Sequence, residues 1–267
     1  MKKRAVTPLF LMVCCFLAEP IEAFAEDSSI KLSACGHHDY PPWNWTSGSE
    51  IKGACAEVTK TLFANLGVDV DLTYVGPWKR CQSYIETGRV DINICSFINE
   101  TRKSYSTFIA TPMGFNEQAV FVNKSASFAF QNWQDLAGKK AGMVLGVSIG
   151  QRFDRYLKDN TNIERVTTYR QNFHKLFHQR VDFIPVGRFS GLAMLQAFGI
   201  KDDIVDLPTS IFTGNLYISM SKKSPYLYLL PEIEKQMQSD DYPVWVKSLL
   251  IKYAGVYAKE AQLKPIE

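Results

Sequence analysis

Hydrophobic and polar positions along the chain follow two periods, one typical of strands and one typical of helices. The segment from Ile30 to Cys35 has the pattern of a short strand, and Ala54 to Leu66 places apolar side chains on one helical face before Gly67. The same analysis predicts a strand from Val68 to Tyr74, a helix from Trp78 to Thr87 and a strand from Val90 to Cys95. This β-α-β-α-β order predicts a parallel sheet.

A second round of the same pattern begins after Gly138. The pattern predicts strands at 140–145, 163–169 and 181–186, with helices at 150–158 and around Phe173. The α/β unit therefore occurs twice, which predicts two lobes.

Two apolar segments connect these rounds. Residues 119–122 are expected to carry the chain into the second lobe, and residues 214–220 to return it to the first, where helices at 227–238 and 242–253 would pack. We expect an α/β protein whose lobes are mostly parallel sheets flanked by helices and joined by two crossing strands. The expected division is lobe 1 at 26–120 and 216–267, and lobe 2 at 121–215.

The first 25 residues have the pattern of an export signal. Three basic residues at positions 2–4 precede an apolar run, and the Ala-Phe-Ala sequence at 23–25 is a small-x-small cleavage site. The apolar run is too short for a membrane-spanning helix. We expect residues 1–25 to be removed, together with Cys14 and Cys15, and the protein to be periplasmic.

Composition and charge indicate which kinds of partner to expect. Removal of the predicted signal takes three basic and two acidic side chains from a chain of net charge +3, which leaves +2. Such a small net charge gives no large single-sign field, so we expect no nucleic-acid partner. With 46% hydrophobic residues the chain can bury sizeable cores. We expect a monomer that binds a small molecule.

Four cysteines follow the predicted signal, and all of them lie in the first third of the chain. An even number in an exported protein indicates one or two disulfides, and three pairings are formally open. Because the sequence has no C-x-x-C pair, we expect neither a metal site nor a cofactor. The four are Cys35, Cys55, Cys81 and Cys95.

Short motifs identify a family by their order and spacing. They are Tyr40-Pro-Pro-Trp43, Gly76-Pro-Trp-Lys-Arg-Cys81, Gly88-Arg-Val-Asp91, Asn99-Glu-Thr-Arg102, Asp135-Leu-Ala-Gly-Lys139 and Gly142-Met-Val-Leu-Gly-Val-Ser148. In these the sequence resembles the polar-amino-acid class of periplasmic solute-binding proteins, bacterial extracellular solute-binding protein family 3. The resemblance implies the two-lobed type II periplasmic-binding-protein-like fold. It also implies capture of a small carboxylate-bearing, amino-acid-like solute, without catalysis, for an inner-membrane ABC permease.

The resemblance also implies which residues bind ligand. Arg102 occupies the place of the family's arginine, whose planar guanidinium offers two parallel donors to a carboxylate. Tyr40 and Trp78 match the aromatic residues that enclose the ligand's aliphatic part, and Trp43 would extend that wall.

Two serines resemble the family's hydroxyl donors. Ser96 follows the third predicted strand, and Ser148 stands at the start of a predicted helix in the other lobe. Ser148 with Gln151 also matches an S-x-x-Q capping box, which would explain this serine without any ligand.

One departure from the family changes the expected ligand. Amino-acid binders carry an aspartate for the ligand ammonium five residues after the position of Asp182, where this chain has Gly187. We therefore expect a ligand that is not a standard α-amino acid. Arg188 or Arg80 would supply a second cation for another anionic group.

The predicted helices suggest one disulfide pairing. Cys55 lies near the start of one first-lobe helix, and Cys81 lies in the first turn of the other. These positions favour a Cys55–Cys81 bridge, with Cys35–Cys95 as a second candidate between strand ends.

Other classes of function remain open at this point. The segment Gly146-Val-Ser148-Ile-Gly150 fits the nucleophile elbow of an esterase, but His174 and His178 on one helix are the only downstream histidines. The same fold also accommodates enzymes of the dehydratase or lyase type, which need a carboxyl acid at the cleft, and orphan sensory binding proteins.

Overall fold

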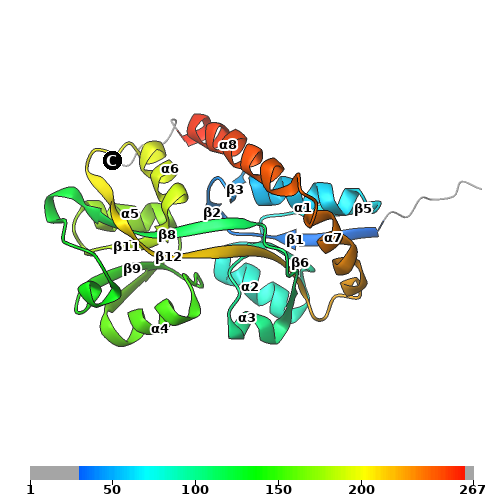
Figure 1. Cartoon of the computed structure of the whole chain (residues 1–267), viewed down its shortest axis with the longest axis horizontal. Coiled ribbons are helices and arrows are strands. Elements are labelled where there is room, and N and C mark those ends of the chain that lie inside the picture. The colour runs from blue at the N-terminus through cyan, green and yellow to red at the C-terminus, as the bar shows by residue number, and fades with distance from the viewer. Residues whose placement is uncertain (1–29, 262–267) are drawn as a thin grey trace, which may run out of the picture.

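The computed structural model describes residues 30–261. Two α/β lobes lie side by side, and long strands run from one into the other (Figure 1). The predicted fold class, a two-lobed α/β protein, is confirmed. The predicted export signal at 1–25, with Cys14 and Cys15, lies outside the described residues.

The first lobe follows the predicted β-α-β-α-β order. Its central strand β1 pairs in parallel with β5 on one side and β6 on the other. The two connections run in opposite directions along the sheet, and both are right-handed, so α1 and α2 cover opposite faces (Figure 1). The elements are β1 (Ile30–Cys35), α1 (Ala54–Ala64), β5 (Val68–Leu72), α2 (Trp78–Thr87) and β6 (Ile92–Ser96).

The second lobe repeats the arrangement. Strand β9 pairs in parallel with β10, and a parallel bridge joins Ala141 to Phe183 just before β11. Helix α6 was not predicted, because its apolar side chains lie on several faces and give no clear helical period. The elements are β9 (Lys140–Val144), α4 (Gln151–Asn160), β10 (Asn162–Val166), α5 (Tyr169–Phe177), β11 (Ile184–Gly187) and α6 (Arg188–Phe198).

Two long antiparallel strands connect the lobes. Strand β8 (Gly114–Asn123) pairs with β11, strand β12 (Ile204–Ser221) pairs with β6, and the two pair with each other. They complete a mixed sheet of order β11-β8-β12-β6-β1-β5. The predicted lobe boundaries at 120/121 and 215/216 fall inside these strands and remain a prediction.

The other elements cover the lobes. Helix α8 packs against α1 of the first lobe and α6 of the second. No helix within residues 30–261 is long and apolar enough to cross a membrane. These elements are β2 (Asp39–Tyr40), β3 (Asn44–Ser47), β4 (Glu50–Lys52), α3 (Glu100–Tyr105), β7 (Ser106–Phe108), η1 (Lys124–Ala126), η2 (Trp133–Leu136), η3 (Leu227–Leu229), α7 (Leu230–Met237) and α8 (Tyr242–Ala261).

Both disulfides lie in the first lobe, but the predicted pairing is wrong. The bridges are Cys35–Cys81, with Cα atoms 5.8 Å apart, and Cys55–Cys95, with Cα atoms 6.0 Å apart. The physical reason is the handedness of the connections: α1 and α2 lie on opposite faces of the sheet, so their cysteines cannot meet. Each helix cysteine instead bonds to a cysteine at the end of a strand.

Candidate ligand-binding site

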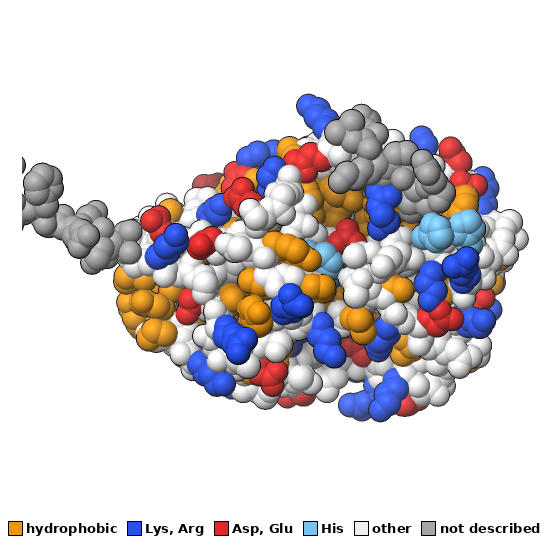
Figure 2. Space-filling view, turned by 180° about the vertical axis from the view of Figure 1, so that it is seen from behind, with side chains coloured by type: hydrophobic (Ala, Val, Ile, Leu, Met, Phe, Trp, Pro, Cys, Tyr) orange, Lys and Arg blue, Asp and Glu red, His pale blue; other side chains and the backbone are white. Residues whose placement is uncertain are grey.

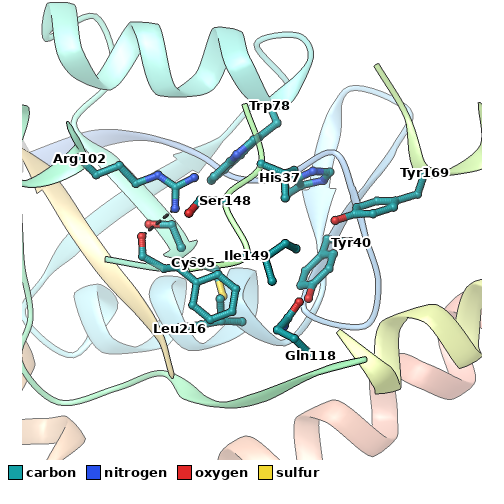
Figure 3. A pocket seen from close by; sticks show the side chains of 13 residues that line it. His37, Tyr40, Trp78, Cys95, Arg102, Gln118, Ser148, Ile149, Tyr169 and Leu216 are labelled. Carbon is teal, nitrogen blue, oxygen red and sulfur yellow. Dashed lines mark hydrogen bonds between the residues drawn. The ribbon is translucent and has the colours of Figure 1, made fainter. Parts of the chain in front are cut away.

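A pocket lies between the lobes, where strand ends and helix starts from both sides face each other. The space between its walls is about 370 Å³, part of which is open to solvent. Figure 3 shows its side chains pointing toward one space. The lining residues are His37, Tyr40, Trp78, Cys95, Ser96, Phe97, Arg102, Gln118, Val147, Ser148, Ile149, Tyr169 and Leu216.

Arg102 is the cation of this pocket. The Asn99 side chain caps α3 by accepting a hydrogen bond of 2.8 Å from the Arg102 backbone N–H, which fixes the arginine in the first helical turn. The guanidinium donates from Nη1 to the Phe97 carbonyl at 2.7 Å and from Nη2 to the Gly146 carbonyl at 3.3 Å. The second bond crosses from the first lobe to the second.

The charge of Arg102 has no ion-pair partner among the described residues. Arg102 is 5% exposed, and no described carboxylate oxygen lies within 4.0 Å of its nitrogens. Burial lowers the pKa of the guanidinium, although Tyr105 and Asp154 nearby act in the opposite direction. Arginine stays protonated in proteins, so the pocket contains an unneutralised positive charge. On the surface, by contrast, basic and acidic side chains are interspersed (Figure 2).

Four rings form one side of the pocket. His37 lies 5.7 Å from Tyr40, 5.3 Å from Trp78 and 5.5 Å from Tyr169, measured between ring centroids. Trp78 also lies 5.4 Å from the Arg102 guanidinium and donates from Nε1 to the Gly146 carbonyl at 3.0 Å. The other three rings are tilted by 32° to 52° to the His37 ring, and the four together provide ring surface beside the cation (Figure 3).

His37 carries an unused hydrogen-bond donor. Its Nδ1 accepts a hydrogen bond of 3.0 Å from the Asp39 backbone N–H, which assigns the proton of the neutral ring to Nε2. Burial, with His38 and Arg102 nearby, lowers the pKa of His37 well below its ordinary value. The buried Nε2 has no partner within the described residues.

The two predicted serines lie on opposite walls. Ser96 is buried, and its Oγ has no hydrogen-bond partner within the described residues. Ser148 does not form the predicted capping box with Gln151, because helix α4 begins two residues later than that motif requires, with Gly150 as its N-cap. Ser148 Oγ donates to Asp154 instead.

Three predicted ligand residues lie outside the pocket. Trp43 is buried in the core against Gly114, and Arg80 is exposed. Arg188 forms ion pairs with Asp206 and Glu117. The sequence placed Arg188 correctly after a strand, but these two carboxylates on the crossing strands already neutralise its charge.

Eight of the lining residues were absent from the predicted ligand set, and three of the eight, His37, Gln118 and Tyr169, have hydrogen-bonding side chains. His37 follows the first strand, a position typical of ligand contacts in parallel sheets, but loop histidines are commonly only exposed. Tyr169 opens helix α5 rather than ending a strand, and Gln118 lies within crossing strand β8. Their convergence depends on how the lobes face each other.

The esterase pattern has no supporting geometry among the described residues. Within residues 30–261 the Ser148 hydroxyl bonds only to Asp154, whereas a serine nucleophile needs a histidine base. His174 and His178 contact each other on α5, with ring centroids 4.4 Å apart, and neither lines the pocket.

Comparison with known proteins identifies the family. Residues 32–245 match the family described as bacterial extracellular solute-binding proteins, family 3. Because the match covers most of the chain, the protein belongs to this family of solute-binding proteins.

The individual relatives that we compared have low sequence identity to this chain. Over 163 residues the chain is 26% identical to the L-cystine-binding protein TcyJ of Escherichia coli K12, covering 59% of each protein. A Streptococcus pneumoniae amino acid ABC transporter substrate-binding protein, AbpA, bound to L-arginine, has a similar fold, with a TM-score of 0.72 at 19% identity over 85% of this chain and 96% of that one. An ancestral amino acid-binding protein, a precursor of cyclohexadienyl dehydratase, gives 0.66 at 21% identity, covering 84% and 95%.

Proposed function

We propose that this protein captures a small carboxylate-bearing solute between its lobes, with Arg102 binding the carboxylate. The observation that carries the proposal is the buried, unpaired guanidinium of Arg102 at the wall of the pocket. An isolated buried charge costs several kcal/mol unless it is paired. A ligand carboxylate would supply the missing charge and accept two parallel hydrogen bonds.

The remaining groups suit the rest of such a ligand. Ser96 Oγ is an unused donor or acceptor on the same wall as Arg102, and Tyr40 and Trp78 offer apolar ring surface. Ser148 lies on the opposite wall. Contact from both walls would bury most of a small solute, as is typical of small-molecule sites.

Closure of the lobes is part of the proposal. The Gly146 carbonyl of the second lobe accepts hydrogen bonds from Trp78 and Arg102 of the first, so the described arrangement is a closed one. A ligand would enter an open form and favour the closed form only if it binds that form more tightly. The crossing strands β8 and β12 are the natural hinge.

The cellular role follows from the family. We infer delivery of the captured solute to an inner-membrane ABC permease, because AbpA belongs to an amino acid ABC transporter and TcyJ binds L-cystine. A periplasmic protein that acts as a monomer after loss of residues 1–25 fits this role. N-terminal sequencing of the periplasmic form should begin at Glu26, and deletion of the protein should abolish uptake of its ligand.

Binding without catalysis is preferred over a dehydratase or lyase reaction. Such an enzyme needs a carboxyl acid at the cleft, and none of the pocket-lining residues is acidic. Incubation of the protein with its best ligand should return the ligand unchanged, whereas detection of a dehydrated product by mass spectrometry would contradict this assignment.

The direct test is a ligand screen followed by substitution of Arg102. A thermal-shift screen against amino acids, amines and organic acids should find a carboxylate that raises the melting temperature. Arg102→Ala should then weaken its affinity by roughly 100-fold or more, since one partner of a buried charge pair is lost. Arg102→Lys keeps the charge but not the planar fork, so it should give an intermediate loss.

Arg80→Ala is the matched control, because Arg80 is an exposed arginine of the same lobe outside the pocket. It should leave the dissociation constant unchanged. Unchanged binding by folded Arg102→Ala protein would contradict the carboxylate assignment.

A further inference from the structure

The charge on the lining of the pocket is positive. Among the described residues that line it, Arg102 is the only charged one, since His37 is neutral at pH 7. Two carboxylates next to lining residues are held outside the lining by hydrogen bonds to the protein: Asp39 accepts a hydrogen bond of 2.6 Å from the Tyr169 backbone N–H, and Asp154 accepts bonds from Ser148 and the Ile149 backbone. A ligand ammonium would therefore enter a positive pocket without an acidic partner, which is costly.

The space that an acid at position 187 would need is filled. A Cβ atom built on Gly187 would lie 2.3 Å from Tyr40 Oη and 2.5 Å from Asn116 Oδ1. These two side chains are hydrogen-bonded, since Asn116 Nδ2 donates to Tyr40 Oη at 2.7 Å. Glycine at this position therefore makes room for a neutral hydrogen-bonded pair, and the neutral character of this end of the pocket is built into the packing.

The unused polar atoms match an uncharged oxygen instead. His37 lines the pocket, and its buried, protonated Nε2 has no hydrogen-bond partner among residues 30–261. Gln118 lies beside Tyr40, and its Oε1 makes no well-formed hydrogen bond within the described residues. A hydroxyl group accepts from one such atom and donates to another, whereas an ammonium cannot accept from His37.

We propose, on the basis of the function proposed above, that the ligand class is an amine-free hydroxycarboxylate. Its carboxylate binds Arg102, and its uncharged oxygen accepts a hydrogen bond from His37 Nε2. Tyr40, Trp78 and Tyr169 flank its hydrocarbon part.

The test compares ligands of one carbon skeleton. Isothermal titration calorimetry would measure lactate against alanine, 2-hydroxyisocaproate against leucine, phenyllactate against phenylalanine and malate against aspartate. The hydroxy acid of the best-fitting skeleton should bind more tightly than its amino acid by roughly tenfold or more, the value of one unsatisfied buried polar group. An amino acid that binds equally well or better would overturn this inference.

The outcomes separate this inference from the proposed function. If amino acids bind more tightly and Arg102→Ala abolishes that binding, the result supports carboxylate capture by Arg102 and contradicts the hydroxycarboxylate class. If no carboxylate of either series binds, the result contradicts both the proposed function and the proposed ligand class.

Substitutions of Gln118 and His37 test the uncharged part of the pocket directly. Gln118→Glu adds a negative charge with little change of shape, so it should move the preference toward the amino acid by roughly tenfold. His37→Gln can place an amide donor near the Nε2 position, whereas the shorter His37→Asn can reach only the Nδ1 position. The hydroxy acid should therefore bind His37→Gln protein more tightly than His37→Asn protein. Equal losses in both variants, or an unchanged preference in Gln118→Glu protein, would contradict the assignment.

Discussion

The two walls of the pocket differ in chemistry and in how they are stabilised. The first-lobe wall has the charge of Arg102 and the unpartnered polar atoms of Ser96 and His37, and its lobe contains both disulfides. The second-lobe wall presents Ile149 and a serine, Ser148, that is already bonded to Asp154, and residues 121–215 contain no cysteine. In the function proposed above, the first lobe provides a fixed binding surface, and the second completes it on closure.

Breaking the disulfides should have the largest effect on this difference. The double substitution Cys55→Ser, Cys95→Ser opens a loop with a sequence separation of 40 residues and should lower the free energy of unfolding by about 2 to 4 kcal/mol. Hydrogen exchange should locate the loss of protection in β1, β5 and β6, with β9 and β10 little changed. Equal loss of protection in both lobes would contradict the conclusion that the disulfides stabilise the first lobe alone.

Closure should be sensitive to a methyl group at Gly146. This residue has a φ of +79°, and a Cβ atom there would lie 3.1 Å from the Lys79 Cα of the facing lobe. Gly146→Ala should weaken ligand affinity by roughly tenfold, because only the closed form brings the added methyl group against Lys79. The backbone strain of about 1 to 3 kcal/mol is present in both forms and should lower stability instead.

Gly67→Ala is the control for that substitution. Gly67 has a similar φ of +71° but nothing within 4 Å of its added Cβ, so it isolates the backbone strain. It should lower the melting temperature without changing ligand affinity, measured by calorimetry. The same affinity loss in both variants would show that contact between the lobes at Gly146 has no part in binding.

The two serines compare the walls directly. Ser96→Ala removes an unpartnered hydroxyl and should weaken binding of the best ligand by roughly tenfold. Ser148→Ala removes a hydroxyl that already bonds to Asp154, so its effect on affinity should be smaller. Calorimetric dissociation constants that rank the two in the opposite order would move the main polar contact to the second lobe.

The lowered pKa of His37 should make the stability of the protein depend on pH. Its pKa is lowered in the folded protein by burial, His38 and Arg102, so below the unfolded value of about 6.5 the unfolded chain binds a proton that the folded protein does not. The stability contribution is therefore full above this pH and is lost as the pH falls toward the folded pKa. Asp39, Tyr40 and Tyr169 also surround this ring.

His37→Gln should remove this pH-dependent contribution to the free energy of unfolding. Between pH 7 and pH 5.5 the wild-type protein should lose about 1 kcal/mol of unfolding free energy relative to the variant, measured by urea denaturation at each pH. Parallel pH profiles for the two proteins would mean that His37 is protonated as readily in the folded protein as in the unfolded chain.

Local signals in the sequence were sufficient for most regular elements of the two lobes, but not for α6. Helix α2 spans Trp78–Thr87 as predicted, because Pro77 precedes its first turn and Gly88 ends it in the left-handed conformation. The family resemblance placed Arg102 a few residues beyond the third strand, and in the structure it lies in α3, after the end of β6. These features depend on residues a few positions apart, so the chain specifies them locally.

Only the tertiary structure decided which distant residues meet. The cysteine pairs depend on which face of the sheet each helix covers, and the ion pairs of Arg188 depend on which crossing strand lies beside it. The contact between His37 and Tyr169 depends on the approach of two lobes. Strand order, crossover handedness and closure set these contacts, and the hydrophobic pattern of a single segment contains none of the three.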